Sequence, residues 1–152
     1  MDPLDLSFID VTDVLYEGEC ALRFAVLREP LGMPRSSVAF PFEGDSLHLV
    51  ATDPDGTVRA CVLFHPDGDG GGRLLQMAVA PELRGEGVGR ALVEHLEAEL
   101  VERGIQSVGL HSRGDATGFY IRLGYAPVGP QYVELGIPHQ NMRKTLSVDV
   151  GA

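Results

Sequence analysis

The sequence is short of thiols and of long apolar runs. Two cysteines, Cys20 and Cys61, occur in 152 residues, and their spacing matches neither a metal site nor a disulfide framework. No apolar run approaches the roughly 20 residues of a membrane-spanning helix, and the acidic start of the chain lacks the segments of a signal peptide. We therefore expect a reduced, cytoplasmic protein with two buried thiols and no membrane partner.

Basic side chains are scarce as well. The chain carries 22 Asp and Glu against 12 Lys and Arg, a formal net charge of -10. This balance argues against nucleic acid as a partner, because phosphate backbones require a basic surface. The glycine-rich run 67–72 lacks the further oxygen ligands of an EF-hand, so we expect a hairpin tip there and no calcium.

The chain does contain the helix and strand patterns of one folded domain, residues 1–152. Residues 1–9 alternate like a first strand, although a loose lead-in is the alternative. Helical spacing runs from Asp13 to the breakers Pro30 and Gly32, with Leu15, Leu22 and Val26 as its apolar positions and Glu19 and Arg23 distributed between them. Residues 33–46 read as a loop with room for a helical turn.

The remaining chain alternates strands and helices. The turn Asp53-Pro54-Asp55-Gly56 joins two strands into a hairpin over 47–64. The further expected elements are a strand over 74–79, a helix over about 88–103, a strand over 106–111, a short helix over 116–123 capped by Asp115, and strands over 125–128, 132–137 and 140–146. This order predicts an α+β fold with a mixed sheet.

The residues between the 74–79 strand and the following helix form a glycine-rich loop, Arg84-Gly85-Glu86-Gly87-Val88-Gly89. Glycine lets backbone N–H groups approach an anion, and the helix behind the loop directs its unpaired N–H groups and positive dipole end to the same place. The loop therefore predicts a phosphate-binding site. The arginines at 84 and 90 supply positive charge locally.

Three known phosphate-binding motifs can be compared with this loop. A Walker loop needs Gly-Lys-Ser/Thr, whereas Gly89 is followed by Arg90 and Ala91. A dinucleotide fingerprint would need glycine at position 90. The pattern Q/R-x-x-G-x-G/A is met in full.

With its surroundings, this loop resembles that of the GNAT superfamily, the acetyl-CoA-dependent N-acetyltransferases. The supporting motifs are Met77-Ala78-Val79-Ala80-Pro81 ahead of the loop and Phe119–Tyr125 after one more strand. The resemblance covers roughly residues 47–146, and the run 134–142 looks like the ElaA-like branch. It implies the GNAT acyl-CoA N-acyltransferase fold, in which helices flank a mostly antiparallel sheet.

The resemblance also implies site roles. The backbone of the loop would hold the pyrophosphate of coenzyme A, and the strand backbone would pair with the pantetheine arm and polarise the thioester carbonyl. Tyr120 matches the tyrosine that protonates the departing sulfur; the alternative is a tyrosine that only packs in its helix. The cofactor-binding positions are Met77, Ala78, Val79, Arg84, Gly85, Glu86, Gly87, Val88, Gly89 and Arg90.

The general base stays open between Glu134 and His139, with His111 as a third candidate. His139 has the more suitable ordinary pKa, whereas Glu134 would need its pKa raised or would act through water. These histidines lack metal-ligand spacing, so we expect no metal. One departure concerns Arg113, which stands where many members place asparagine; it would meet a coenzyme phosphate or lie in solvent.

We expect an enzyme that acetylates a primary amine of a small molecule or peptide. The alternative is a module that binds acyl-CoA without catalysis. The side chains of 13–46 and 131–142, where this fold builds its acceptor pocket, do not specify the amine. A monomer and a homodimer are both compatible with the sequence.

Overall fold

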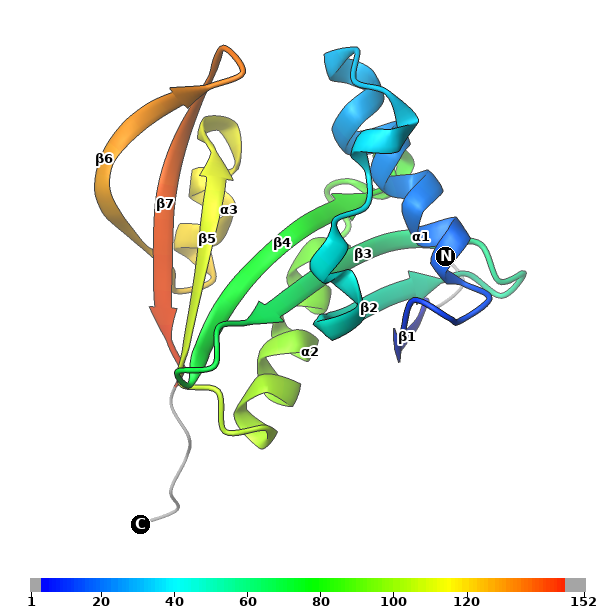
Figure 1. Ribbon diagram of the computed structural model, residues 1–152, viewed down its shortest axis with the longest axis horizontal. Helices are drawn as coiled ribbons and strands as arrows, with labels where there is room; N and C mark the ends of the chain where they lie inside the picture. The colour runs from blue at the N-terminus through cyan, green and yellow to red at the C-terminus, as the bar shows by residue number, and fades with distance from the viewer. Residues whose placement is uncertain (1–3, 147–152) are drawn as a thin grey trace. The chain divides into compact units, whose positions relative to one another are not determined.

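The computed structural model describes residues 4–146 (Figure 1). Seven strands follow the hydrogen-bonded order β1-β2-β3-β4-β5-β7-β6. β4 and β5 run parallel, whereas β1–β2, β2–β3, β5–β7 and β6–β7 are antiparallel. The predicted α+β class with a mixed, mostly antiparallel sheet is confirmed. No helix of the described residues is both long and apolar enough to cross a membrane.

The helices and strands have these bounds: β1 Asp5–Ile9, α1 Tyr16–Arg23, η1 Phe24–Arg28, η2 Glu29–Leu31, η3 Arg35–Ser37, η4 Pro41–Asp45, β2 Leu47–Thr52, β3 Val58–Pro66, β4 Gly71–Val79, η5 Pro81–Leu83, α2 Val88–Glu102, β5 Ser107–Arg113, η6 Gly114–Ala116, α3 Thr117–Arg122, β6 Ala126–Glu134 and β7 Ile137–Thr145. The helical pattern expected from Asp13 onward is realised as α1, one π-helical stretch (η1) and a final 3-10 turn (η2) that ends at left-handed Gly32.

The chain divides into two compact units. The first holds the described residues up to His65 together with Gln76–Leu96, and the second holds Pro66–Leu75 together with the described residues from Glu97 onward. β4 and α2 therefore contribute one end to each unit.

In the first unit, helices cover both faces of the strands. Val50 and Cys61 are register partners on β2 and β3 and share an apolar cluster with residues of α1 and η1. Phe8 pairs with Leu49, the neighbour of Val50, and so faces the other way; its ring stacks on His95 of α2 with centroids 5.7 Å apart. The sheet core thus lies between α1 on one side and α2 on the other.

In the second unit, burial alternates along β5 and β7. Val108, Leu110 and Met142 are buried, whereas His111 and Asn141 on the opposite face are exposed. The end of α2 lies on the buried side, where Glu97 accepts hydrogen bonds from Tyr125 Oη and Lys144 Nζ, both at 2.8 Å. The odd-numbered residues of β5 and β7 consequently form an open face, a term used below for that side of β5, β7 and β6.

Two details of the predicted second half are wrong. The structure has one strand, β6, where we expected a break at Gly129-Pro130, because a register shift between Val128 and Tyr132 absorbs those residues. An edge strand tolerates proline because its outer N–H groups need no partner. The chain then turns at Leu135 and Gly136, whose φ values of 54° and 73° suit a tight hairpin.

The expected capping role of Asp115 is also wrong. The N-cap of α3 is Ala116, and no side chain accepts a hydrogen bond there. Asp115 lies instead inside the 3-10 turn η6, which precedes the helix and supplies its entry.

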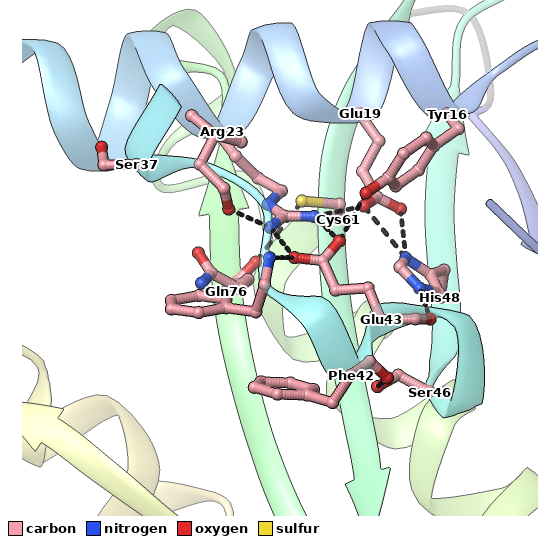
Figure 2. Close-up of polar contacts among 12 residues, drawn as sticks. Tyr16, Glu19, Arg23, Ser37, Phe42, Glu43, Ser46, His48, Cys61 and Gln76 are labelled. Carbon is pink, nitrogen blue, oxygen red and sulfur yellow. Dashed lines mark hydrogen bonds and ion pairs between the residues drawn. The ribbon is translucent and has the colours of Figure 1, made fainter. Parts of the chain in front are cut away.

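Buried charges join α1 to the loop before β2 (Figure 2). Arg23 Nη1 donates to Glu19 Oε2 at 2.7 Å and to Glu43 Oε1 at 2.9 Å, and Nη2 donates to Glu43 Oε2 at 2.6 Å. None of the three side chains is more than 2% exposed. Removing such charges from water is costly, so each depends on the others for compensation.

Neighbouring groups satisfy the remaining lone pairs of Glu43. Tyr16 Oη and the Phe40 backbone N–H each donate to its carboxylate at 2.7 Å. Burial alone would raise the pKa of Glu43, but the hydrogen bonds from Arg23 and Tyr16 outweigh burial and lower it. The carboxylate therefore stays ionised in the core.

His48 on β2 completes this group. Its Nδ1 lies 3.0 Å from both carboxylate oxygens of Glu19, and its Nε2 lies 2.9 Å from the Glu43 carbonyl oxygen. Carboxylate and carbonyl oxygens only accept, so both ring nitrogens must donate and His48 is an imidazolium. Burial opposes this charge, yet the Glu19 carboxylate raises the pKa of His48 overall. Two cations and two carboxylates balance, and we call Glu19, Arg23, Glu43 and His48 the buried charge cluster.

Glu19 and Arg23 stand between the apolar positions of their helix in the sequence, but both are fully buried. The spacing of Glu19 and Arg23 along the helix was the sequence feature that could have indicated their burial. Positions 15, 19, 22, 23 and 26 share one helical face, so a charged pair on that face predicts mutual compensation in the core.

Removal of Arg23 should destabilise the fold strongly. Arg23→Met leaves two buried carboxylates without their main counter-charge, and we expect a loss of about 3–5 kcal/mol in the free energy of unfolding. The control is Arg35→Met, which removes the exposed ion pair with Glu17 and should cost less than about 1 kcal/mol. Urea denaturation measures both, and equal losses in the two variants would contradict a compensating role for Arg23.

Stability should also fall with alkaline pH. Because the pKa of His48 is raised in the folded state, its stabilisation is complete below its ordinary value of 6.5 and is lost as pH rises through the folded value. Denaturation at several pH values from about 6 to about 9 should give a declining free energy of unfolding in the wild type and a flatter profile in His48→Gln. His95→Gln removes an exposed imidazole and should keep the wild-type slope. Parallel slopes in all three proteins would refute the imidazolium.

Candidate active site

The glycine-rich loop leads from η5 into α2. Arg84 is extended, with φ -65° and ψ 143°, and Gly85 and Gly87 follow at φ 83° and 82°. A Cβ at either glycine would meet no atom within 4 Å. Glycine is therefore required by the left-handed backbone and not by crowding.

The loop leaves a row of backbone donors unused. The N–H groups of Arg84 and Glu86 turn back to the carbonyls of Pro81 and Leu83, and Ala91 bonds Gly87 as the first α-helical contact. Five N–H groups donate to no acceptor in the described part of the first unit: Gly85, Gly87, Val88, Gly89 and Arg90. Such a cluster at the start of a 15-residue helix favours an anion there.

The two arginines that flank the glycines differ. Arg84 is exposed, and no ion pair engages it within the described residues of the first unit. Arg90 is exposed too, but its Nε donates to Glu94 at 2.7 Å, which offsets its charge. Arg84 is therefore the side chain that supplies positive charge to the loop.

The strand before the loop carries a local distortion. Gln76 adopts φ 56°, a left-handed conformation that is rare for a residue other than glycine. Two contacts hold it: Cys61 Sγ donates to its carbonyl oxygen at 3.4 Å, and Arg28 Nη2 donates to its Oε1 at 3.2 Å. Burial raises the pKa of Cys61 well above its usual range, so the thiol keeps the proton it donates.

The predicted coenzyme-binding positions on β4 come directly after Gln76 in the chain. Ala78 is buried in the core cluster of the first unit, and Met77 and Val79 are half-buried. The register of β4 with β5 covers Gly71–Arg73. Strained backbone of the kind seen at Gln76 is common at functional sites. Neither the left-handed Gln76 nor its contacts with Cys61 and Arg28 could be recognised from the sequence, because no local pattern marks a left-handed glutamine.

Tyr120 is packed within α3. It is 6% exposed, and its ring contacts those of Phe119 and Tyr125 edge-on at 4.9 and 5.7 Å between centroids. Burial raises the pKa of Tyr120 to about 12. No group of the described second unit hydrogen-bonds its hydroxyl, so the phenol is protonated and without a partner there.

The three candidate bases gather on the open face. Register pairs Glu134 with Ile137, His139 with Tyr132 and His111 with Asn141. Tyr132 stacks on His139 at 5.7 Å and meets the His111 ring edge-on at 6.4 Å. Tyr120 lies on the other side of β5, because Ser112 on the buried face contacts Thr117 of the same helix.

The local contacts distinguish these bases. The Ile137 carbonyl lies 2.8 Å from His139 Nδ1 and can only accept, so Nδ1 carries a proton and a neutral ring exposes a basic Nε2. The pKa of His111 is lowered by partial burial and by the charge of Arg73, although Glu134 opposes this. Glu134 is exposed at the hairpin end. His139 therefore combines a fixed tautomer with a free lone pair.

Among the described residues, three potential metal ligands meet only in the buried charge cluster. Ligand atoms of Glu19, Glu43 and His48 lie within 4.8 Å of one another. The guanidinium of Arg23 already bonds both carboxylates, and both nitrogens of His48 act as donors. The cationic groups of Arg23 and His48 already bond the carboxylates that a metal ion would need as ligands, so the cluster does not suit metal binding.

Comparison with known proteins places this geometry in a family. The model of the acetyltransferase (GNAT) domain matches residues 35–146. A Bacillus subtilis (strain 168) protein named as an acetyltransferase is 33% identical over 129 residues, which is 81% of this chain and 84% of that protein.

Solved structures agree. An acyl-CoA N-acyltransferase from Pseudomonas aeruginosa aligns with a TM-score of 0.79 and 26% identity, over 93% of this chain and 99% of the other. Escherichia coli ElaA aligns with a TM-score of 0.81 and 22% identity, over 93% and 99% of the two chains, and so shares the fold. The glycine loop at the start of α2 lies inside the matched region, and the chain belongs to the GNAT acetyltransferase family.

Proposed function

We propose that this protein transfers an acetyl group from acetyl-CoA to a primary amine of a small molecule or peptide. The observation that carries the proposal is the row of five unused backbone donors over Gly85–Arg90, where α2 begins. The start of a helix suits a diphosphate, because several unpaired N–H groups and the positive end of the helix dipole lie together there. Membership of the GNAT family makes the pyrophosphate of coenzyme A the fitting occupant.

The strand ahead of the loop would hold the rest of the coenzyme. The backbone of Met77, Ala78 and Val79 would pair with the amide-bearing pantetheine arm as a further strand does. A backbone N–H fixed there would polarise the thioester carbonyl and stabilise the oxyanion of the tetrahedral intermediate. The supported left-handed turn at Gln76 fixes the direction in which this stretch leaves the paired part of β4.

The chemistry is direct attack of the amine on the thioester. The base removes one proton from the ammonium, and the amine nitrogen then bonds the carbonyl carbon. The carbon–sulfur bond breaks as this nitrogen loses its second proton to solvent. Tyr120 would donate its proton to the departing thiolate, because its phenol carries the proton when the carbon–sulfur bond breaks. His139 is our choice of base because its Nδ1 is fixed by Ile137 and its Nε2 is free to accept; Glu134 is the alternative. Tyr120 and His139 lie on opposite faces of β5, so the acid and the base would reach the thioester from its two sides.

Binding of the coenzyme tests the loop. Gly87→Glu forces a side chain and a negative charge into the left-handed position, so affinity for acetyl-CoA should fall by at least about 100-fold. The matched control is Gly56→Glu, which has the same charge, a similar φ of 88° and open surroundings in the β2–β3 turn. Calorimetry should show wild-type affinity for Gly56→Glu, and unchanged affinity in Gly87→Glu would overturn the assignment of the loop.

Turnover tests the reaction and the acid. A panel of primary amines should release coenzyme A from acetyl-CoA, and Tyr120→Phe should lower kcat by about 100-fold while leaving the KM for acetyl-CoA nearly unchanged. Tyr125→Phe removes the neighbouring buried hydroxyl that bonds Glu97, and it should affect stability more than kcat.

The outcomes separate the candidate functions. Tight binding of acetyl-CoA with no turnover of any amine would favour a non-catalytic acyl-CoA-binding module. Equal kcat in Tyr120→Phe and wild type would remove Tyr120 from the chemistry while leaving the transferase intact.

A further inference from the structure

Arginine side chains gather on the open face of the second unit. Arg113 and Arg143 project from β5 and β7 on the side that carries His111, because strand residues two apart share a face and register partners share it across strands. Arg73 pairs with Gly109 and joins the same side. Three guanidinium groups on one face are unusual in a chain whose net charge is -10.

The acidic counterpart on this face is small. The ion pairs within the described second unit are Arg103–Glu99 and Lys144–Glu97, and neither lies on the open face. Arg143 donates to the Ser107 hydroxyl, a neutral partner, at 3.4 Å. Glu134 shares the face at the hairpin end, and Asp115 follows Arg113 in η6. The surplus is therefore positive around Arg113 and His111.

Arg113 is the member of this group that lacks a partner. It is half-buried, and its Nε is fully buried without any hydrogen bond. Buried guanidinium N–H groups in folded proteins nearly always meet an acceptor, because a buried charged donor without one loses the hydrogen bond that water gave it. The buried Nε of Arg23 also lacks a partner, but four other bonds compensate that guanidinium. The guanidinium of Arg113, by contrast, has no hydrogen bond or ion pair within the described second unit.

The position of Arg113 relates it to the proposed base. It is the register partner of His139, and directly opposed residues of antiparallel strands lie about 5 Å apart. If the Arg113 guanidinium holds an oxyanion of a small molecule, an atom of the same molecule that contacts His139 is then only a few covalent bonds away from that oxyanion. A planar guanidinium matches the two oxygens of a carboxylate or phosphate.

We propose that Arg113 binds an oxyanion, a carboxylate or phosphate, that the amine acceptor itself carries a few bonds from its amino group. The inference rests on the proposed acetyl transfer for the meaning of "acceptor", but the binding site stands on Arg113 alone. The enzyme would then prefer short amino acids or amino phosphates to simple alkylamines. Arg113, which stands where many family members have asparagine, would bind the anionic group of the acceptor.

The test uses matched probes and needs no turnover. Calorimetry on the full chain saturated with coenzyme A compares β-alanine with β-alaninamide, and phosphoethanolamine with ethanolamine. Both members of each pair carry an ammonium group, and β-alanine and phosphoethanolamine, called the charged members below, add an oxyanion to it. We expect at least one charged member to bind about 10-fold or more tightly than its partner without the oxyanion, and which pair responds distinguishes a carboxylate from a phosphate site. Equal or weaker binding of both charged members in the wild type would overturn the proposal without any variant.

Variants then locate the site. Arg113→Gln should abolish the preference for the charged member, and Arg113→Lys should retain part of it, because lysine keeps the charge but loses the two-pronged geometry. Arg143→Gln removes a guanidinium from the same face and should keep the full preference. Retention of the preference in Arg113→Gln, with circular dichroism showing an intact fold, would refute the assignment to Arg113.

The same probes separate this inference from the acetyltransferase proposal. Preferred binding of a charged member without its acetylation would contradict the proposed reaction and leave the oxyanion site supported. Acetylation of both members with equal kcat/KM would support the reaction and overturn the site.

Discussion

The guanidinium of Arg23 is the group on which the first unit depends. It lies where α1, the loop before β2 and the sheet meet, and it is hydrogen-bonded to two carboxylates and to the Val38 carbonyl. Apolar packing alone would allow α1 to slide on β2, because dispersion contacts have little directionality. A buried ion with fixed donors does not allow this, since any displacement leaves a charge uncompensated.

This constraint extends toward the proposed site through one further arginine. Arg28, one turn beyond Arg23, donates a hydrogen bond to the side chain of left-handed Gln76, and the Cys61 thiol donates one to the Gln76 carbonyl oxygen. The burial of Arg28 and the nearby charge of Arg23 lower its pKa, although both guanidinium groups remain protonated. The backbone that would meet the thioester is thus positioned by η1 and β3, so residues far from the chemistry determine its geometry.

Local chemistry explains what could be predicted from the sequence. The turn at Asp53–Gly56, the hairpin around it and the glycine loop before α2 depend on the φ preferences of their own residues, and all three appear where expected. The helix end at Gly32 follows the same rule. Such features need no tertiary information.

The rest depends on contacts between distant segments. Asp115 has a good capping side chain, but η6 intervenes before α3. The burial of Glu19 becomes necessary only once Glu43 and His48 are brought to it from 24 and more residues away, because in isolation a charged helix position favours solvent. The gathering of Glu134, His139 and His111 on one face is likewise set by strand register. Sequence identified these three residues individually, but pairing across three strands was required to relate them.

Net charge proves a poor guide to the ligands of this protein. A value of -10 suggests attraction of cations, yet the proposed coenzyme is a polyanion and the proposed acceptor carries an anionic group. At the glycine loop the positive potential comes from backbone dipoles, which do not enter the count of charged side chains. On the open face we assign the anionic group of the acceptor to Arg113, which strand register places opposite His139. Charges beyond a Debye length of about 8 Å are largely screened at physiological ionic strength, so the local arrangement at each site decides what binds there.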